Sequence, residues 1–151
     1  MRKVEATICI HTTPEKAISA FTNPTMLQEW WGVERTLIEL KTGGVYTLAW
    51  QISDKGFGFV SSGSIKEHQP DKLFAVENMV YMNPEKPFLG PMSFTVTAKP
   101  KGDTTEVYIC QEGYQTGEVW DWYYQAVKDA WPAALLTLKA YLEKKFALAG
   151  S

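Results

Sequence analysis

The sequence predicts an α+β fold in which an antiparallel sheet of about seven strands packs against a long C-terminal helix. Apolar residues recur at every second position over most of residues 33–112, which is the period of a half-buried strand. Over residues 117–144 they recur every three or four positions, which is the period of one helical face. At ~1.5 Å per residue this helix would be about 40 Å long, so its apolar face requires a partner as broad as a sheet.

The N-terminal segment predicts one strand followed by two short helices. Residues 4–10 alternate between apolar and polar side chains, as in a strand with one buried face. Thr13 and Pro14 then supply an N-cap and a proline at the first helical position. Asn23 and Pro24 repeat this pair and predict the start of a second helix.

Six further strands are expected after these helices. They lie in residues 33–40, 45–52, 59–67, 73–79, 92–99 and 105–112. Most connections between them are short and carry turn signals, so neighbouring strands should be antiparallel. The longer connection, residues 81–91, holds three prolines and is expected to be a rigid surface loop; the alternative is a lid over a binding site.

Composition predicts one domain, residues 1–151, in which 45% of the residues are hydrophobic and can form a sizeable core. A net charge of -2 with no long run of one sign argues against nucleic-acid binding. No apolar run is long enough for a membrane span and no signal-type N-terminus is present, so a cytoplasmic location is expected. Cys9 and Cys110 lie in separate predicted strands and are expected to be free thiols.

Aromatic residues make up 13% of the chain and include six tryptophans. This is more ring area than packing alone requires, and it indicates a cavity lined by rings. Within residues 45–52, the apolar face consists of Tyr46, Leu48, Trp50 and Ile52 and should point toward the long helix. Trp50 is the leading candidate for a cavity wall, although plain core packing would bury it equally well.

Two polar side chains are candidates for the same inner face. Gln111 falls on the apolar face of residues 105–112, where its amide would need hydrogen-bond partners. In a regular strand over residues 73–79, Glu77 shares one face with Leu73, Ala75 and Met79. If that face is the inner one, Glu77 points into the cavity, where a buried carboxylate could bind a ligand or transfer a proton. The alternative is that a bulge or a shifted register places Glu77 in solvent.

The two halves of the long helix are expected to have different roles. Rings crowd its N-terminal half, where Trp120, Tyr124 and Trp131 are expected to roof the mouth of the cavity. Its C-terminal half is aliphatic and is expected to pack on the sheet. Between the halves, Pro132 removes a backbone hydrogen bond and clashes with the preceding turn. We expect either one helix bent near residues 129–131 or two separate segments.

No motif for catalysis or metal binding stands out. The chain contains no G-x-S-x-G, H-E-x-x-H or glycine-rich phosphate loop. Its two histidines, His11 and His68, have no second histidine or cysteine at metal-ligand spacing and are expected at the surface. The sequence therefore predicts no catalytic residue, no metal and no cofactor.

A series of short motifs resembles one known family. In chain order they are Thr13-Pro14-Glu15, Asn23-Pro24 with Trp30-Trp31, Gly43-Gly44-x-Tyr46, Gly63-x-Ile65-x-Glu67, Thr105-x-Val107-x-Ile109 with Glu112-Gly113-Tyr114, and Trp131-x-x-x-Leu135-x-x-Leu138. Together they resemble the family named for an activator of the ATPase of the ninety-kilodalton heat-shock chaperone. That family belongs to the START-like, birch-pollen-allergen-like helix-grip superfamily, with polyketide cyclases and lipid-transfer domains.

The resemblance implies a helix-grip fold, in which a curved sheet wraps around the C-terminal helix. It does not specify function, because members of this superfamily bind, carry or transform varied ligands on one scaffold. Two positions depart from the family pattern. Gln111 stands where relatives tend to have histidine, and His68 stands where they tend to have an aliphatic residue. An imidazole-based reaction inside the cavity is therefore not expected.

The first functional hypothesis is non-catalytic binding of a small hydrophobic or aromatic molecule in the cavity. The residues expected to contact it are Tyr46, Trp50, Glu77, Gln111, Trp120, Tyr124 and Trp131. The second hypothesis is a cyclase- or hydrolase-type enzyme in which Glu77 transfers a proton. The third, implied by the family name, is a module that binds a chaperone or another protein, and a homodimer is also left open.

Overall fold

The computed structural model describes residues 2–147 as one strand, two helices, six strands and a long helix. The elements are β1 (Lys3–Ile10), α1 (Pro14–Thr22), α2 (Pro24–Trp31), β2 (Arg35–Ile38), β3 (Val45–Trp50), β4 (Phe59–Gln69), β5 (Leu73–Met82), β6 (Leu89–Lys101), β7 (Thr104–Glu112) and α3 (Glu118–Lys145). The strands form one antiparallel sheet of seven, in the order β1-β7-β6-β5-β4-β3-β2. The predicted fold class is confirmed.

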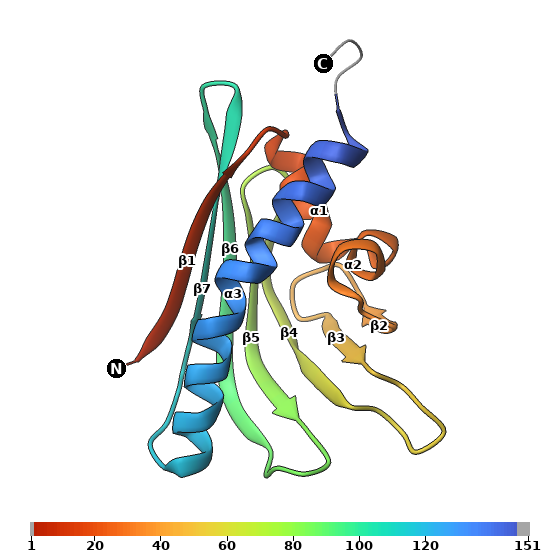
Figure 1. Cartoon of the computed structure of the whole chain (residues 1–151), viewed down its shortest axis with the longest axis vertical. Helices are drawn as coiled ribbons and strands as arrows, with labels where there is room; N and C mark the ends of the chain where they lie inside the picture. The colour runs from red at the N-terminus through yellow and green to blue at the C-terminus, as the bar shows by residue number, and fades with distance from the viewer. Residues whose placement is uncertain (1, 148–151) are drawn as a thin grey trace.

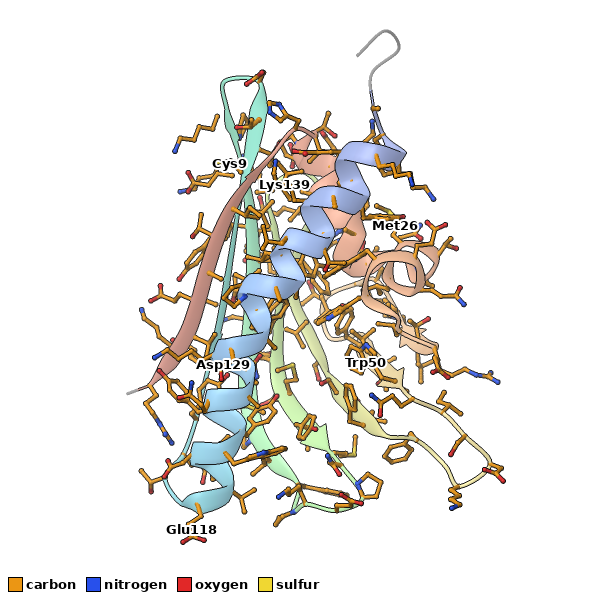
Figure 2. All side chains as sticks on the ribbon, in the orientation of Figure 1. Cys9, Met26, Trp50, Glu118, Asp129 and Lys139 are labelled. Carbon is orange, nitrogen blue, oxygen red and sulfur yellow. The ribbon has the colours of Figure 1, made fainter. Side chains whose placement is uncertain are left out.

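The sheet curves around α3, with β1 at one edge and β2 at the other (Figure 1). The long helix crosses the concave face of the sheet at a slant, and α1 and α2 lie beside its C-terminal half. Side chains from the sheet, α3 and the two short helices point into the space between helix and sheet (Figure 2). This is the helix-grip arrangement that the resemblance implied.

The two short helices begin at the predicted caps. The side chain of Thr13 accepts a hydrogen bond from the backbone N–H of Lys16, and that of Asn23 accepts one from Met26 at 3.0 Å. Each cap is followed by a proline at the first helical position, where no backbone donor is lost. α2 ends at Gly32, whose φ of 71° is the left-handed conformation that glycine adopts without strain.

α3 is a single helix that continues through Pro132. The sequence left open either one bent helix or two separate segments, and the alternative of two segments is therefore wrong. The two halves of the helix run at different inclinations across the sheet in Figure 1, as expected where a proline interrupts the hydrogen-bond ladder. The C-terminal half forms core, because Leu135, Leu138 and Leu142 are fully buried against the sheet and the short helices.

Two strand boundaries differ from the prediction in ways that affect side-chain direction. β3 ends at Trp50, and Gln51 turns the chain with a φ of 56°. Ile52 therefore leaves the sheet and is 38% exposed, so its predicted inward position is wrong. β5 and β6 extend beyond the predicted ends, which shortens the 81–91 connection to a turn around residues 83–88.

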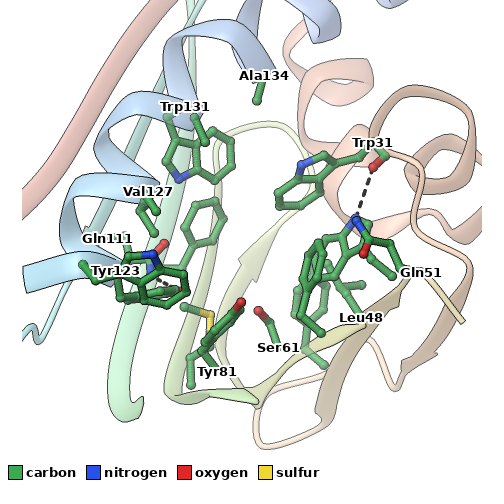
Figure 3. Close-up of a pocket in the computed structure, with 18 residues that line it drawn as sticks. Trp31, Leu48, Gln51, Ser61, Tyr81, Gln111, Tyr123, Val127, Trp131 and Ala134 are labelled. Atoms are coloured by element: carbon green, nitrogen blue, oxygen red, sulfur yellow. Dashed lines mark hydrogen bonds between the residues drawn. The ribbon is translucent and has the colours of Figure 1, made fainter. Parts of the chain in front are cut away.

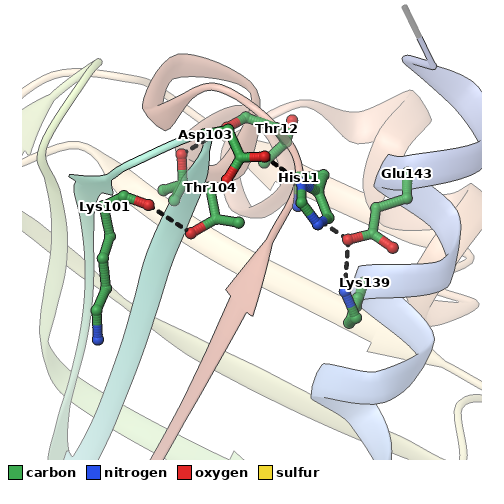
Figure 4. Close-up of polar contacts among 8 residues, drawn as sticks. His11, Thr12, Lys101, Asp103, Thr104, Lys139 and Glu143 are labelled. Carbon is green, nitrogen blue, oxygen red and sulfur yellow. Dashed lines mark hydrogen bonds and ion pairs between the residues drawn. The ribbon is translucent and has the colours of Figure 1, made fainter. Parts of the chain in front are cut away.

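A polar network holds the C-terminal end of α3 against β1 (Figure 4). The backbone N–H of His11 donates to Glu143 Oε2 at 2.8 Å, and Lys139 Nζ donates to the same oxygen at 2.5 Å. These two donors hold the pKa of the Glu143 carboxyl below its usual range. His11 Nδ1 also lies 3.7 Å from Asp103 Oδ2 in the β6–β7 turn. The network is exposed to water, so it positions the helix end more than it stabilises the fold.

Candidate functional site

A cavity of about 540 Å³ lies between the concave face of the sheet and the N-terminal half of α3 (Figure 3). Every strand from β3 to β7 contributes to its lining, as do the end of α2 and one face of α3. Its lining residues are Trp31, Tyr46, Leu48, Trp50, Gln51, Phe59, Ser61, Met79, Tyr81, Phe94, Gln111, Trp122, Tyr123, Ala126, Val127, Ala130, Trp131 and Ala134. This volume is within the range of pockets that hold one drug-sized molecule.

Paired aromatic rings make the walls of the cavity. On the sheet side, the rings of Trp50 and Phe59 stack with centroids 5.0 Å apart. On the helix side, Trp131 stacks on Phe94 of β6 at 5.5 Å. Trp31 joins these two walls, because its centroid lies 5.2 Å from that of Trp50 and 5.4 Å from that of Trp131. Such ring pairs are favourable beyond their buried area and hold the wall side chains in place.

Hydrogen bonds fix the orientation of two of these wall side chains. Trp50 Nε1 donates to the backbone carbonyl of Trp31 at 3.1 Å, which ties β3 to the end of α2. The Tyr46 hydroxyl donates to the backbone carbonyl of Phe21 at 2.5 Å. Both polar groups are therefore already paired with backbone carbonyls, and the two residues line the cavity without needing a polar partner from a ligand.

Two polar side chains of the cavity, Gln111 and Tyr123, meet at the junction of β7 and α3, whereas Gln51, Ser61 and Tyr81 lie elsewhere in the lining. Gln111 Nε2 donates to the Tyr123 hydroxyl at 3.1 Å and lies 3.5 Å from Met92 Sδ. Both side chains are buried, with Gln111 4% and Tyr123 7% exposed. Burial raises the pKa of Tyr123 to about 12, so its phenol is protonated at neutral pH.

Four of the seven predicted ligand-contact residues line this cavity: Tyr46, Trp50, Gln111 and Trp131. The other three, Glu77, Trp120 and Tyr124, lie outside it. The structure therefore brings together the sheet residues and the central tryptophan of α3, and separates them from the first two rings of the predicted helix stripe.

Glu77 lies outside the cavity because β5 changes its register. In β5, Phe74 and Val76 point inward, but the pairing with β6 skips from Val76 to Met79. Two residues of β5, Glu77 and Asn78, stand opposite the single residue Ser93 of β6, and Asn78 has a φ of 52°. Met79 then points inward again, so the predicted common face of residues 73–79 is wrong. The register shift of the second alternative is present, and it leaves Glu77 half-buried outside the cavity rather than in solvent.

Trp120 and Tyr124 pack on the side of α3 that faces Tyr114 rather than the cavity. Their ring centroids lie 6.2 Å and 5.1 Å from that of Tyr114, and the Arg2 guanidinium lies 4.8 Å from the Tyr124 ring centroid. The cavity face of α3 is the neighbouring one, which includes Tyr123. Of the expected roof of rings, Trp131 lines the cavity, and Tyr123 lines it in place of Trp120 and Tyr124.

Tyr114 is buried, and its hydroxyl has no hydrogen-bond partner among residues 2–147. We expect Tyr114→Phe to raise the free energy of unfolding by about 1 kcal/mol, because a buried unpaired hydroxyl opposes folding. The matched variant Tyr46→Phe removes a donor from the Phe21 carbonyl and should lower it by about 1–3 kcal/mol. Urea denaturation of the two variants measures both changes, and a Tyr114→Phe protein less stable than the original would contradict the expectation.

Several cavity residues were not singled out from the sequence, although some left a signal. Phe59 and Ser61 lie opposite Trp50 and Leu48 in the β3–β4 pairing, so strand parity would have placed them inside. On α3, the alanines at positions 126, 130 and 134 recur every four residues and mark a face of small side chains. Such a face next to a ring-rich stripe is a signal for a space beside the helix.

The remaining sequence expectations concern the cysteines, metal ligands, membrane spans and histidines. Cys9 and Cys110 are free thiols. Among residues 2–147, no cluster of three metal-ligating side chains is present, and no helix has the length and hydropathy of a membrane span. His11 is exposed and His68 is half-buried, where burial lowers the pKa of its imidazole.

Comparison with known proteins identifies a family and a set of similar folds. A family model described as "Activator of Hsp90 ATPase homolog 1-like protein" matches residues 11–143. No curated protein sequence matches the chain significantly. The Aha1 dimer of Colwellia psychrerythraea is 17% identical with a TM-score of 0.71, covering 95% of this chain and 97% of its own.

Two further solved structures have the same fold. Protein MLL2253 of Mesorhizobium loti is 21% identical with a TM-score of 0.75, covering 95% of this chain and 98% of its own. CalU16 of Micromonospora echinospora is 19% identical with a TM-score of 0.65, covering 96% of this chain and 78% of its own. At these identities the likeness concerns the fold alone.

Proposed function

Because this chain belongs to the family of Activator of Hsp90 ATPase homolog 1-like proteins and encloses a ring-lined cavity, we propose that it binds a small hydrophobic or aromatic molecule there. The observation that carries the proposal is the cavity of about 540 Å³ between the sheet and α3. A space of this size lined by tryptophan, tyrosine and phenylalanine is larger than a packing defect, since folded cores leave few voids bigger than a water molecule.

The proposed ligand contacts are the cavity residues that the sequence indicated, together with their neighbours in the walls. Tyr46, Trp50 and Trp131 would supply ring surface, and Gln111 with Tyr123 would supply polar contact. The three rings would contribute more binding free energy than the polar pair. The hydrophobic contribution is proportional to the apolar area removed from water, and the rings offer the larger area. Trp122 is 41% exposed and also lines the cavity, so it lies where a ligand would enter.

We expect Ala130→Phe to weaken binding of apolar ligands at least ~10-fold, because the added ring would occupy the cavity from the α3 side. Native mass spectrometry and tryptophan fluorescence with a panel of aromatic compounds and lipids measure the affinity. The matched control is Ala133→Phe, since Ala133 is exposed on the same helix and does not line the cavity. Equal affinities of the two variants, or no binding by the original protein, would contradict the proposal.

The enzyme hypothesis loses its proton-transfer group in this structure. Glu77 lines a separate depression with Asn78, Ser93 and Glu112 and does not line the cavity that contains Trp50 and Trp131. Non-catalytic binding is therefore the proposal that the geometry favours.

Protein partners remain a separate proposal. The family description supports an interaction with a chaperone, and the dimer named in the Colwellia structure supports a homodimer. Exposed Leu37 on the edge strand β2 and Leu40 just after it offer apolar surface for either contact.

A further inference from the structure

The charge of the cavity lining restricts the ligand. Among its lining residues, no side chain is an aspartate, glutamate, lysine, arginine or histidine. A carboxylate or ammonium group that entered would lose its hydration without gaining an ion partner, which costs several kcal/mol. An uncharged molecule avoids this cost.

The hydrogen-bond direction between Gln111 and Tyr123 leaves one donor and one acceptor free, side by side. The Gln111 amide nitrogen donates to the Tyr123 oxygen at 3.1 Å and points a second hydrogen toward Met92 Sδ at 3.5 Å. The Tyr123 O–H therefore remains available as a donor. The Gln111 carbonyl oxygen accepts no hydrogen bond from residues 2–147 and remains available as an acceptor.

A hydroxyl group is the complement of such a pair, because it accepts one hydrogen bond and donates another. A carboxylate could use only the Tyr123 donor and would place its charge against the Gln111 carbonyl. A plain hydrocarbon would use neither group and would leave both buried groups without partners, which costs free energy at each.

The rings beside this pair favour a flat ligand body. Tyr81 lies next to Tyr123 with ring centroids 4.6 Å apart, and Trp131 stacks on Phe94 at 5.5 Å. These planar side chains offer extended faces on which another ring can stack.

We propose that the cavity selects an uncharged aromatic molecule that carries a hydroxyl group, with the hydroxyl bound between Tyr123 and Gln111. This inference rests on the proposed ligand-binding function and adds the chemical class of the ligand. The other polar side chains of the lining, Gln51, Ser61 and Tyr81, are less buried than Gln111 and Tyr123 and form a weaker site. The Tyr81 hydroxyl also already accepts a hydrogen bond from Asn83 Nδ2 at 3.2 Å.

Three probes of one shape test the proposal: naphthalene, 2-naphthol and 2-naphthoate. NMR titration of the nitrogen-labelled protein at pH 7 gives the three dissociation constants, and the indole N–H signals of Trp50 and Trp131 report binding in the cavity. We expect 2-naphthol to bind ~10-fold more tightly than naphthalene. The difference in affinity between 2-naphthol and 2-naphthoate should be larger than this.

Tyr123→Phe keeps the ring and removes the hydroxyl, so it should abolish the preference for 2-naphthol over naphthalene, measured as the ratio of the two dissociation constants in the same variant. Tyr81→Phe is the matched control and should keep the preference, since it removes a hydroxyl from the same cavity at another polar position. If Tyr123→Phe does not fold, as judged by circular dichroism, Gln111→Met removes the other polar partner and serves the same comparison.

The outcomes separate this inference from the function on which it rests. Binding of naphthalene or 2-naphthoate as tightly as 2-naphthol would overturn the inference and leave the ligand-binding function standing. Loss of the preference in Tyr81→Phe but not in Tyr123→Phe would also overturn it. Absence of binding by all three probes would count against the ligand-binding function itself.

Discussion

Phe21→Ala should lower the free energy of unfolding by about 3–5 kcal/mol, which would be the largest effect of any single substitution considered for this protein. Phe21 is fully buried at the end of α1, and its ring centroid lies 5.5 Å from that of Trp30 and 6.0 Å from that of Phe94. Removing the ring leaves a cavity among side chains that other contacts already hold in place, so the site collapses little. Urea denaturation followed by circular dichroism measures the change.

Phe88→Ala is the matched control, because Phe88 is 72% exposed on the β5–β6 connection. We expect its free energy of unfolding to stay within about 0.5 kcal/mol of the original. A loss of similar size in both variants would contradict the assignment of Phe21 to the centre of the core, and would mean that Phe88 is covered in solution.

Alkaline pH should destabilise the protein steeply, because burial raises the pKa of three tyrosines: Tyr46, Tyr114 and Tyr123. For Tyr123 the pKa is about 12, against an ordinary value near 10. Above pH ~10 the unfolded chain releases these phenol protons while the folded protein retains them. The folded state then binds more protons, so the free energy of unfolding falls as pH rises.

Each of these tyrosines contributes about 1.4 kcal/mol per pH unit where only the unfolded chain has lost its proton, so the three together contribute about 4 kcal/mol per pH unit. Tyr108 and Tyr141, whose pKa values are also raised, add to this slope. Urea denaturation at a series of pH values from 9 upward measures the slope, and absorbance near 295 nm reports tyrosine ionisation. Tyr123→Phe should reduce the slope by about 1.4 kcal/mol per pH unit. A free energy of unfolding that stays constant between pH 10 and 12 would contradict the burial of these phenols.

The strand and helix assignments followed from local patterns. Strand alternation placed Tyr46, Leu48 and Trp50 on the inner face because β3 has no bulge in its pairing with β4. The caps at Thr13 and Asn23 act through their own side chains and the next turn of backbone. Interactions of this kind depend on residues a few positions apart, so the sequence is sufficient to predict them.

The candidate site was predicted in part for the same reason. Gln111 lies inside because β7 alternates regularly from Thr105 to Gln111. Glu77 was misplaced because a register shift in β5 depends on the pairing with both neighbouring strands, and one strand's sequence does not reveal it. The cavity face of α3 was predicted only in part, because a helix with rings on several sides can present more than one of them to the sheet.

Taken by itself, the sequence determined the fold class, the order of the elements, the core role of the C-terminal half of α3 and the inner positions of Trp50 and Gln111. Only the tertiary structure decided that α3 continues through Pro132, that Glu77 lies outside the cavity, and that Tyr123 rather than Tyr124 faces it. The physical reason is one of range: alternation and capping are local, whereas register, helix rotation and the space left between layers depend on how all the side chains pack together.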